Sequence, residues 1–152
     1  MDTRDINKLL QGQTGFLGTF PRDQLPTVIK RRPSGLIVNT DTASEPGEHW
    51  VAIYLANDSC GEYFDSFGLP PLHKEIIAFL NDHNDNGWVY NTITLQDVSS
   101  DTCGIYTAFY LQSRLSGYSN EQFLSLFTKH GKINDFIAPY LYLLSRTPAS
   151  GR

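Results

Sequence analysis

The stretch QDVSSDTCGIYTAFYLQSRL, residues 96–115, decides how this chain folds. Its first part, residues 96–102, is polar and typical of a loop. From Cys103 to Leu115, apolar and aromatic residues recur with helical spacing on more than one face. This pattern predicts a helix that is buried on most sides and begins at Cys103, so other elements of the fold must cover it.

Upstream of this helix, short runs rich in β-branched and aromatic residues predict four strands. They cover residues 35–40, 49–56, 62–67 and 88–95. The second and third runs are separated by a short turn and are expected to form a hairpin. Residues 14–21 contain Gly15 and Gly18 and indicate a loop with turns.

The remaining segments with helical spacing lie at the start, in the middle and near the end of the chain. They cover residues 5–11, 71–80, 120–128 and 133–144, and residues 145–152 are expected to be a frayed tail. Strands in the first two thirds and helices in the last third predict an α+β fold. The length of 152 residues predicts a single domain over 1–152.

The composition excludes several classes of protein. Hydrophobic residues make up 40% of the chain and charged residues 18%, so a disordered chain is excluded. No apolar run reaches about 18 residues, and no membrane span is expected. The polar N-terminus shows no secretory signal. Two cysteines are too few for a disulfide scaffold or a cysteine-based zinc site, and we expect them to be reduced thiols inside the cell.

Charge is distributed unevenly along the chain, whose net charge is -4. Residues 1–40 hold six basic and three acidic residues, whereas residues 41–101 hold eleven acids against Lys74 alone. The middle of the chain should therefore repel phosphate, although a solvated acidic face is the more common meaning of such a stretch. The cluster Lys30-Arg31-Arg32 is a weak signal for nucleic acid.

Cys103 is the strongest candidate for a reactive group. The start of a helix carries partial positive charge and unpaired N–H groups, and both stabilise a thiolate. Ser100, Asp101 or Thr102 is expected to cap this helix. Gly104 has no side chain and would let a substrate approach the thiol. The alternative is an inert cysteine buried at the start of a core helix.

A nucleophilic thiol needs a base, and His49 is the best candidate. It begins one strand of the predicted hairpin, and Asp65 lies near the end of the next strand. Because antiparallel pairing brings those ends together, the carboxylate can orient the imidazole. The other histidines, His73, His83 and His130, have surroundings typical of surface residues. Asp82, His83 and Asp85 lack the spacing of metal ligands, so no metal or other cofactor is expected.

Five sequence features together resemble the adenovirus-type cysteine proteases (adenain) and their relatives in virus-like DNA transposons. The first three are His49-Trp50, Phe64-Asp65-Ser66-Phe67-Gly68, and Gln96 placed seven residues before Cys103-Gly104. Residues 16–20 resemble the family's N-terminal segment, and residues 37–40 resemble the strand before its histidine loop. The resemblance covers about residues 14–115. The SUMO-deconjugating proteases belong to the same broad clan.

The resemblance implies a fold and a role for each residue of the motif. The fold is a small mixed sheet packed against a central helix that bears the cysteine at its N-terminus. Cys103 corresponds to the nucleophile, His49 to the general base and Asp65 to the acid that orients it. Gln96 corresponds to the donor of the oxyanion hole, together with the backbone N–H of Cys103. Trp50 and Gly104 are expected to contact the substrate.

The implied activity is that of a thiol endopeptidase which cuts polypeptides next to small residues such as glycine. Its expected substrates are capsid precursors of a virus or virus-like transposon. Expected locations are the host nucleus or cytoplasm, or a virion, and the expected state is a monomer. Two alternatives stay open: a deconjugase acting on ubiquitin-like tails, and a non-catalytic binding module that keeps the fold.

The chain departs from the adenoviral pattern in two places that bear on regulation. Adenoviral members have Glu where Asp65 stands, and they are activated by DNA and by a disulfide-linked viral peptide. Thr92 stands where the cysteine that binds this peptide would be expected. We therefore expect activity without DNA and without such a peptide.

Overall fold

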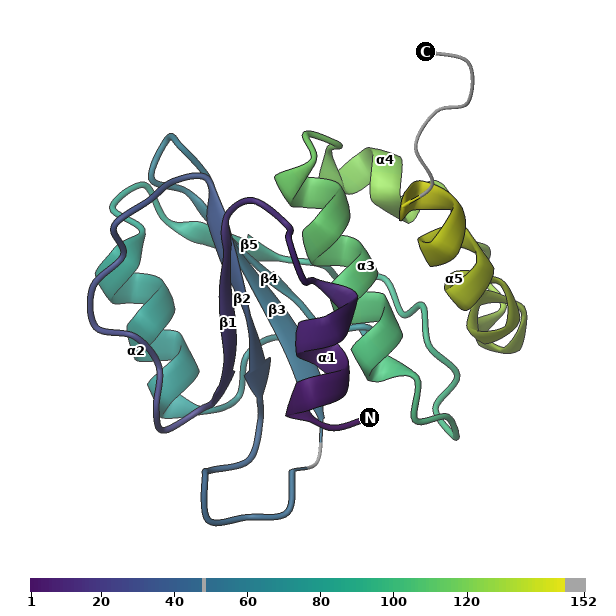
Figure 1. Ribbon diagram of the computed structural model, residues 1–152, viewed down its shortest axis with the longest axis horizontal. Helices are drawn as coiled ribbons and strands as arrows, with labels where there is room; N and C mark the ends of the chain where they lie inside the picture. Colours follow the sequence, from purple (N-terminus) through teal and green to yellow (C-terminus); the bar gives the residue numbers. More distant parts are fainter. Residues whose placement is uncertain (48, 147–152) are drawn as a thin grey trace.

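The computed structural model describes residues 1–47 and 49–146 of the chain (Figure 1). The described strands are β1 (Phe16–Pro21), β2 (Ser34–Asn39), β3 (Trp50–Leu55), β4 (Gly61–Phe64) and β5 (Trp88–Tyr90). The described helices are α1 (Thr3–Leu9), α2 (Lys74–His83), α3 (Cys103–Leu115), α4 (Asn120–Leu124) and α5 (Gly131–Arg146). The predicted α+β class is confirmed.

The strands form one mixed sheet in the order β1-β2-β3-β4-β5. The central pairs β2–β3 and β3–β4 are antiparallel, whereas β1 and β5 each join the sheet in parallel. The predicted hairpin is confirmed, with Ala52 opposite Phe64 and Leu55 opposite Gly61. This register places the N-terminal end of β3 beside the C-terminal end of β4.

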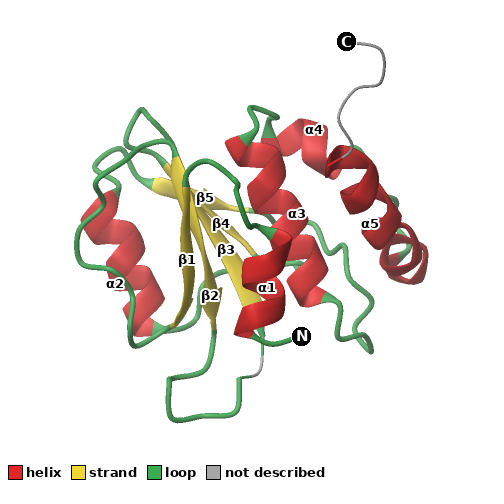
Figure 2. Cartoon of the chain, viewed as in Figure 1, coloured by secondary structure: helices red, strands yellow, loops and turns green. Residues whose placement is uncertain are grey.

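Helices cover both faces of the sheet (Figure 2). Because side chains alternate along a strand, β3 contributes to two separate cores. Trp50, Ala52 and Tyr54 pack with α1 and α3 on one face. Val51, Ile53 and Leu55 pack against α2 on the other. A strand that is buried on both faces has apolar side chains at successive positions, which explains the continuous apolar run in the sequence.

Helix α3 has the predicted bounds and lies against the middle of the sheet (Figure 1). Its residues Tyr106, Ala108 and Leu111 are fully buried. A side chain at Gly35 of β2 would overlap Leu111, so the glycine allows the helix to approach the strand closely. This packing fixes the position of Cys103 relative to the sheet.

Strand β1 was predicted as loop and turns, and that prediction is wrong. The strand pairs with β2 at the edge of the sheet, and its register shifts between Phe16 and Thr19. Gly18 has a φ of 129° at this irregularity, and Pro21 ends the strand. Glycine at a bulge and proline at an edge are compatible with a strand, although both look like loop residues in a sequence.

The strand predicted over residues 88–95 ends at Tyr90. The next residue, Asn91, uses its side chain to bond the backbone of Asp65 and the carbonyl of Ile93. These side-chain contacts replace the backbone hydrogen bonds that would extend the pairing of β5 with β4. The rest of the predicted strand is therefore a loop that runs toward Gln96.

The other helices exist, but their bounds differ from the predicted ones. Helix α1 starts earlier because Asp2 caps it, α2 starts later with His73 as its N-cap, and α4 ends earlier. Helix α5 includes Ser145 and Arg146, which were expected in the tail, and residues 147–152 lie outside the described residues. None of the described helices combines the length and apolar character needed to span a membrane.

Candidate active site

His49 and Asp65 meet at the end of the β3–β4 hairpin. His49 directly precedes β3 and Asp65 directly follows β4. The distance between His49 Nε2 and Asp65 Oδ1 is 3.0 Å. The same carboxylate oxygen accepts a hydrogen bond of 2.8 Å from the backbone N–H of Phe67. The predicted juxtaposition of the imidazole and the carboxylate is therefore present in the structure.

Asn91 holds Asp65 in place, which the sequence did not reveal. Its amide oxygen accepts from the Asp65 N–H at 3.0 Å, and its amide nitrogen donates to the Asp65 carbonyl at 2.9 Å. Asp65 and Asn91 are 4% and 6% exposed, so these bonds form away from solvent. The two-point contact fixes the backbone from which the carboxylate projects.

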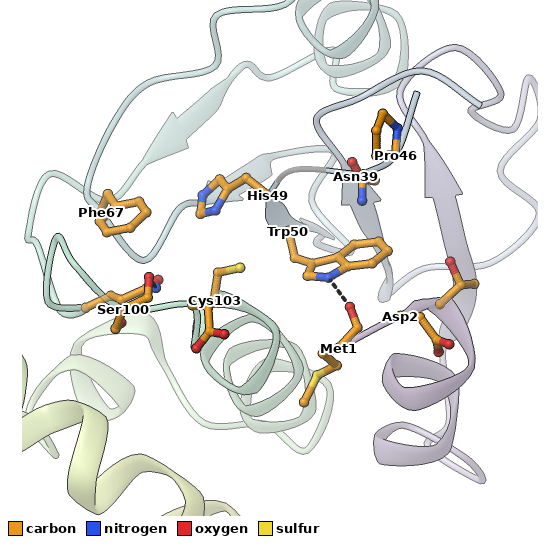
Figure 3. Close-up of a pocket in the computed structure, with 13 residues that line it drawn as sticks. Met1, Asp2, Asn39, Pro46, His49, Trp50, Phe67, Ser100 and Cys103 are labelled. Carbon is orange, nitrogen blue, oxygen red and sulfur yellow. Dashed lines mark hydrogen bonds between the residues drawn. The ribbon is translucent and has the colours of Figure 1, made fainter. Parts of the chain in front are cut away.

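Cys103 is the first residue of α3, and its sulfur lies on the side of the helix that faces His49 (Figure 3). Because Nε2 of His49 faces Asp65, Nδ1 is the ring nitrogen left for the thiol. Thr102 is the N-cap residue, but its hydroxyl donates to Asp135 and makes no cap bond. The predicted side-chain cap is therefore absent, and the first N–H groups of α3 are not satisfied by it.

The charge state of His49 is set by its two neighbours. Burial alone would lower the pKa of His49, because it disfavours the charged ring. The hydrogen bonds to Asp65 and Cys103, and the negative charge of both groups, outweigh burial and raise the pKa of His49 to about 9. At neutral pH the ring is accordingly an imidazolium placed between a carboxylate and a sulfur.

Gln96 lies beside this pair and is almost fully buried, with 1% of the residue exposed. Its Nε2 donates to the Ser100 carbonyl at 2.8 Å, and its Oε1 accepts from the Ser66 hydroxyl at 2.6 Å. An amide nitrogen has two hydrogens, so one remains for another acceptor. Gln96, His49 and Cys103 all line the same cavity.

The cavity has a volume of about 600 Å³ and lies between the ends of the strands and the start of α3 (Figure 3). Trp50 and Phe67 line it from either side of His49. The Phe67 ring stacks on the imidazole with 5.2 Å between ring centroids. The indole N–H of Trp50 donates to the Met1 carbonyl at 3.2 Å, which fixes the orientation of the ring. A pocket that combines aromatic walls with hydrogen-bonding side chains suits a polypeptide segment.

Gly104 has a different environment from the one expected. A side chain at this position would overlap Met1 and Ile6, so Gly104 packs against the N-terminal segment and α1. The glycine is needed for packing α1 against α3, and the expected contact of Gly104 with a substrate stays a prediction. The other cysteine, Cys60, lies in the β3–β4 turn, and both cysteines are free thiols.

Helix α5 anchors the loop between Gln96 and Cys103. The Asp135 carboxylate accepts from the Thr102 and Tyr106 hydroxyls at 3.1 and 2.8 Å. The amide of Asn134 donates to the Leu95 carbonyl at 3.0 Å. These contacts could not be predicted from the sequence, because they join groups 29 to 39 positions apart.

Similar sequences are found among proteins of African swine fever virus. A cysteine protease of a tick isolate from Malawi is 32% identical over 101 residues, which is 60% of this chain and 37% of the relative. A protein named SUMO-1 cysteine protease, from a warthog isolate from Namibia, is 31% identical over 110 residues, which is 64% of this chain and 40% of the relative. These relatives are cysteine proteases by name. No protein-family model matches the chain.

The fold is found in solved structures as well. The crystal structure of the African swine fever virus protease aligns with a TM-score of 0.65 and 22% identity, covering 92% of this chain and 66% of the other. The central domain of an uncharacterised Legionella pneumophila protein aligns with a TM-score of 0.56 and 14% identity, covering 95% and 96%. The mixed sheet with its helices is therefore a fold that a viral protease uses.

The chain spans about two fifths of the length of the curated relatives it matches. The comparisons support a likeness to a viral cysteine protease, one of whose names refers to SUMO-1. The adenovirus-type and transposon features of the sequence resemblance go beyond these matches.

Proposed function

We propose that this chain is a cysteine endopeptidase in which Cys103 is the nucleophile, His49 the general base and Asp65 the orienting acid. One observation carries the proposal. His49 lies between the Asp65 carboxylate, at 3.0 Å, and the sulfur of Cys103, in a cavity that Gln96 also lines. An imidazolium beside a thiol at a helix start is the arrangement that supplies a thiolate at neutral pH.

The chemistry follows from these contacts. The Cys103 thiolate attacks the carbonyl carbon of the scissile peptide bond, a C–S bond forms, and the carbonyl oxygen takes the negative charge. His49 donates its proton to the departing amine as the C–N bond breaks, which leaves a thioester on Cys103. The now neutral His49 takes a proton from water as the water oxygen attacks the thioester, the C–S bond breaks, and the carboxylic acid product leaves. The Cys103 thiolate and the His49 imidazolium are thereby regenerated.

Gln96 and the start of α3 are placed to stabilise the oxyanion. The second hydrogen on Gln96 Nε2 and the backbone N–H of Cys103 both belong to groups at the cavity. Donors that are already in position cost no reorganisation when the charge develops. A neutral amide also leaves the charge balance of the imidazolium and the thiolate unchanged.

Small residues, glycine above all, are the proposed neighbours of the cleaved bond. Trp50 and Phe67 line the cavity on either side of the thiol (Figure 3). A peptide segment made of glycine passes between aromatic rings more easily than a segment with bulky side chains. Capsid precursors of a virus or virus-like element are the proposed natural substrates, a choice that the likeness to a cysteine protease of African swine fever virus supports.

A second candidate is the processing of a ubiquitin-like protein. It is favoured by the name SUMO-1 cysteine protease carried by one of the relatives. The chemistry at Cys103 would be the same, since a ubiquitin-like tail also presents glycines to the cleaved bond. The two candidates differ in whether a folded partner must dock beside the cavity.

Two substrates compared side by side separate these candidates. One is a capsid precursor with a glycine-rich junction, and the other is a SUMO-1 fusion whose tail has the same residues around the cleaved bond. Endopeptidase function predicts a kcat/KM for the precursor at least as high as that for the fusion. A fusion cleaved about 100-fold faster than the precursor would favour the deconjugase, and cleavage of neither would reject both.

A further inference from the structure

Ser66 contacts Gln96 through both its side chain and its backbone. Its hydroxyl donates to Gln96 Oε1 at 2.6 Å. Its carbonyl accepts from the N–H groups of Leu95 and Gln96 at 2.8 and 3.1 Å. Ser66 is 0% exposed, so no solvent competes for these bonds. Ser66 therefore holds the backbone at Leu95 and Gln96 and the side-chain amide of Gln96 at the same time.

The two ends of the Gln96 amide have nearly the same shape, so sterics alone do not decide which end faces which neighbour. The Ser100 carbonyl can only accept, and it bonds Nε2. The Ser66 hydroxyl donates to Oε1. With both neighbours in place, a rotated amide would put two oxygens against each other at Ser100. The pair thus fixes Nε2 as the end that offers a hydrogen to the cavity.

We infer that Ser66 is a positioning residue that holds the Gln96 amide as an oxyanion donor, an inference that rests on the function proposed above. Asp65 and Ser66 are adjacent in the chain, and the first contacts His49 while the second contacts Gln96. One dipeptide at the end of β4 therefore orients the general base and the oxyanion donor together. Neither contact requires Ser66 to touch the substrate.

A serine with a merely structural role would give a different kinetic result. If the hydroxyl only satisfied its own hydrogen bond in the core, its loss would lower stability and affect all reactions at Cys103 equally. If it positions Gln96, its loss affects only reactions that develop an oxyanion. Alkylation of Cys103 by iodoacetamide develops none, because the thiolate displaces iodide from a carbon without forming a tetrahedral intermediate.

The test is Ser66→Ala in the full chain, assayed with a glycine-containing fluorogenic peptide. We expect kcat to fall about 10-fold with KM changed less than two-fold, a smaller loss than the 10²–10³ seen when an oxyanion donor is itself removed. The affinity for a peptide aldehyde, which forms an oxyanion on the thiol, should fall by a similar factor. The rate of Cys103 alkylation should stay within two-fold of wild type.

A double-mutant comparison with Gln96→Ala makes the test sharper. Because Ser66 acts through Gln96, adding Ser66→Ala to Gln96→Ala should change kcat less than two-fold. Ser34→Ala is the matched control, since Ser34 is also 0% exposed and its hydroxyl has no hydrogen-bond partner among the described residues. It should leave kcat unchanged.

The outcomes separate this inference from the proposed function. If wild type does not cleave the peptide, the proposed function fails. If wild type cleaves and Ser66→Ala matches it, the positioning role is rejected. The role is also rejected if alkylation of Cys103 falls together with kcat, because Ser66 would then support the whole site, or if the losses in the double mutant add.

Discussion

His49 is held by three contacts that leave its ring little freedom. Asp65 bonds Nε2, Phe67 stacks on one face, and Cys103 lies toward the other nitrogen. An imidazole fixed in this way has a defined tautomer and a defined direction for its proton. The charge of the site therefore depends on the pH at which this one ring loses its proton.

The pH dependence of activity should follow His49. Its pKa is raised to about 9, so the imidazolium is present at neutral pH and is lost as the pH rises through about 9. We expect kcat/KM to fall on the alkaline side with a midpoint near pH 9. Asp65→Asn removes the nearest negative charge and should move this midpoint to lower pH by about 1–3 units. Rate profiles from pH 5 to 10 check this, and an unmoved alkaline limb would contradict the assigned role of Asp65.

The two thiols should differ in reactivity. Cys103 has a helix start and an imidazolium beside it, and both stabilise a thiolate. Partial burial and the Asp58 carboxylate raise the pKa of the Cys60 thiol. At pH 6, iodoacetamide should label Cys103 at least 10-fold faster than Cys60, as measured by mass spectrometry of the peptides. Cys60→Ser is the control and should leave both labelling of Cys103 and peptide cleavage intact.

At the residue scale, the sequence predicted the contact between His49 and Asp65 because hairpin pairing brings their positions together. The proposed roles of Gln96 and Cys103 came from their spacing and its resemblance to a protease family. Asn91 could not be predicted, since its bonds join a side chain to backbone atoms 26 residues away. Such contacts follow from the final positions of loops, which no local pattern encodes.

At the scale of elements, an ion pair links β4 to α3. The Glu62 carboxylate accepts from the Arg114 guanidinium at 3.0 Å and from the Tyr110 hydroxyl at 2.6 Å. The Glu62 and Arg114 side chains are 18% and 15% exposed. The Arg114 guanidinium also lies 4.3 Å from the centre of the Tyr54 ring. These contacts connect the strand that ends at Asp65 with the helix that begins at Cys103.

Removing this carboxylate should destabilise the fold. Glu62→Ala leaves a partly buried guanidinium and a buried hydroxyl without their acceptor, which costs about 3 kcal/mol in the free energy of unfolding. Urea denaturation followed by circular dichroism measures the loss. Asp85→Ala, which removes an exposed carboxylate from a loop, is the matched control and should change the free energy by less than about 0.5 kcal/mol. Equal stability of Glu62→Ala and wild type would show that solvent replaces the carboxylate.

The elements differ in how well the sequence predicted them. Helix α3 has a long, strongly apolar pattern, and both of its ends were predicted correctly. Strand β1 was missed because Gly18 and Pro21 suit an irregular edge strand as well as a loop. Strand β5 was predicted too long because Asn91 ends the pairing through its side chain. Local patterns predicted the elements that are buried, and they failed where a single side chain ends or bends a strand.

At the scale of the whole molecule, most residues of the candidate site belong to the acidic part of the sequence. His49, Asp65 and Gln96 all belong to residues 41–101, where eleven acids face one lysine. Two of these acids lie close by, since Asp65 bonds His49 and Asp101 lines the cavity. Phosphate contacts need basic side chains that can displace counterions. We therefore expect this part of the chain to offer no binding surface for an activating polynucleotide.

Activity should accordingly be independent of DNA. We expect the turnover of a glycine-containing peptide to change less than two-fold when duplex DNA is added, at both 50 and 200 mM salt. The measurement needs only the purified chain and the fluorogenic peptide. A large stimulation that disappears at the higher salt concentration would show that basic residues outside 41–101 form a DNA surface and regulate the site.

The central claim is that Cys103 performs nucleophilic catalysis with His49 as its base. The most direct test is the turnover of a glycine-containing fluorogenic peptide by wild type, Cys103→Ala and His49→Ala at pH 7. We expect turnover by wild type, none by Cys103→Ala, and a loss of at least 10²-fold in kcat for His49→Ala. Turnover by Cys103→Ala at the rate of wild type, or a folded wild-type chain that cleaves no peptide, would contradict the claim.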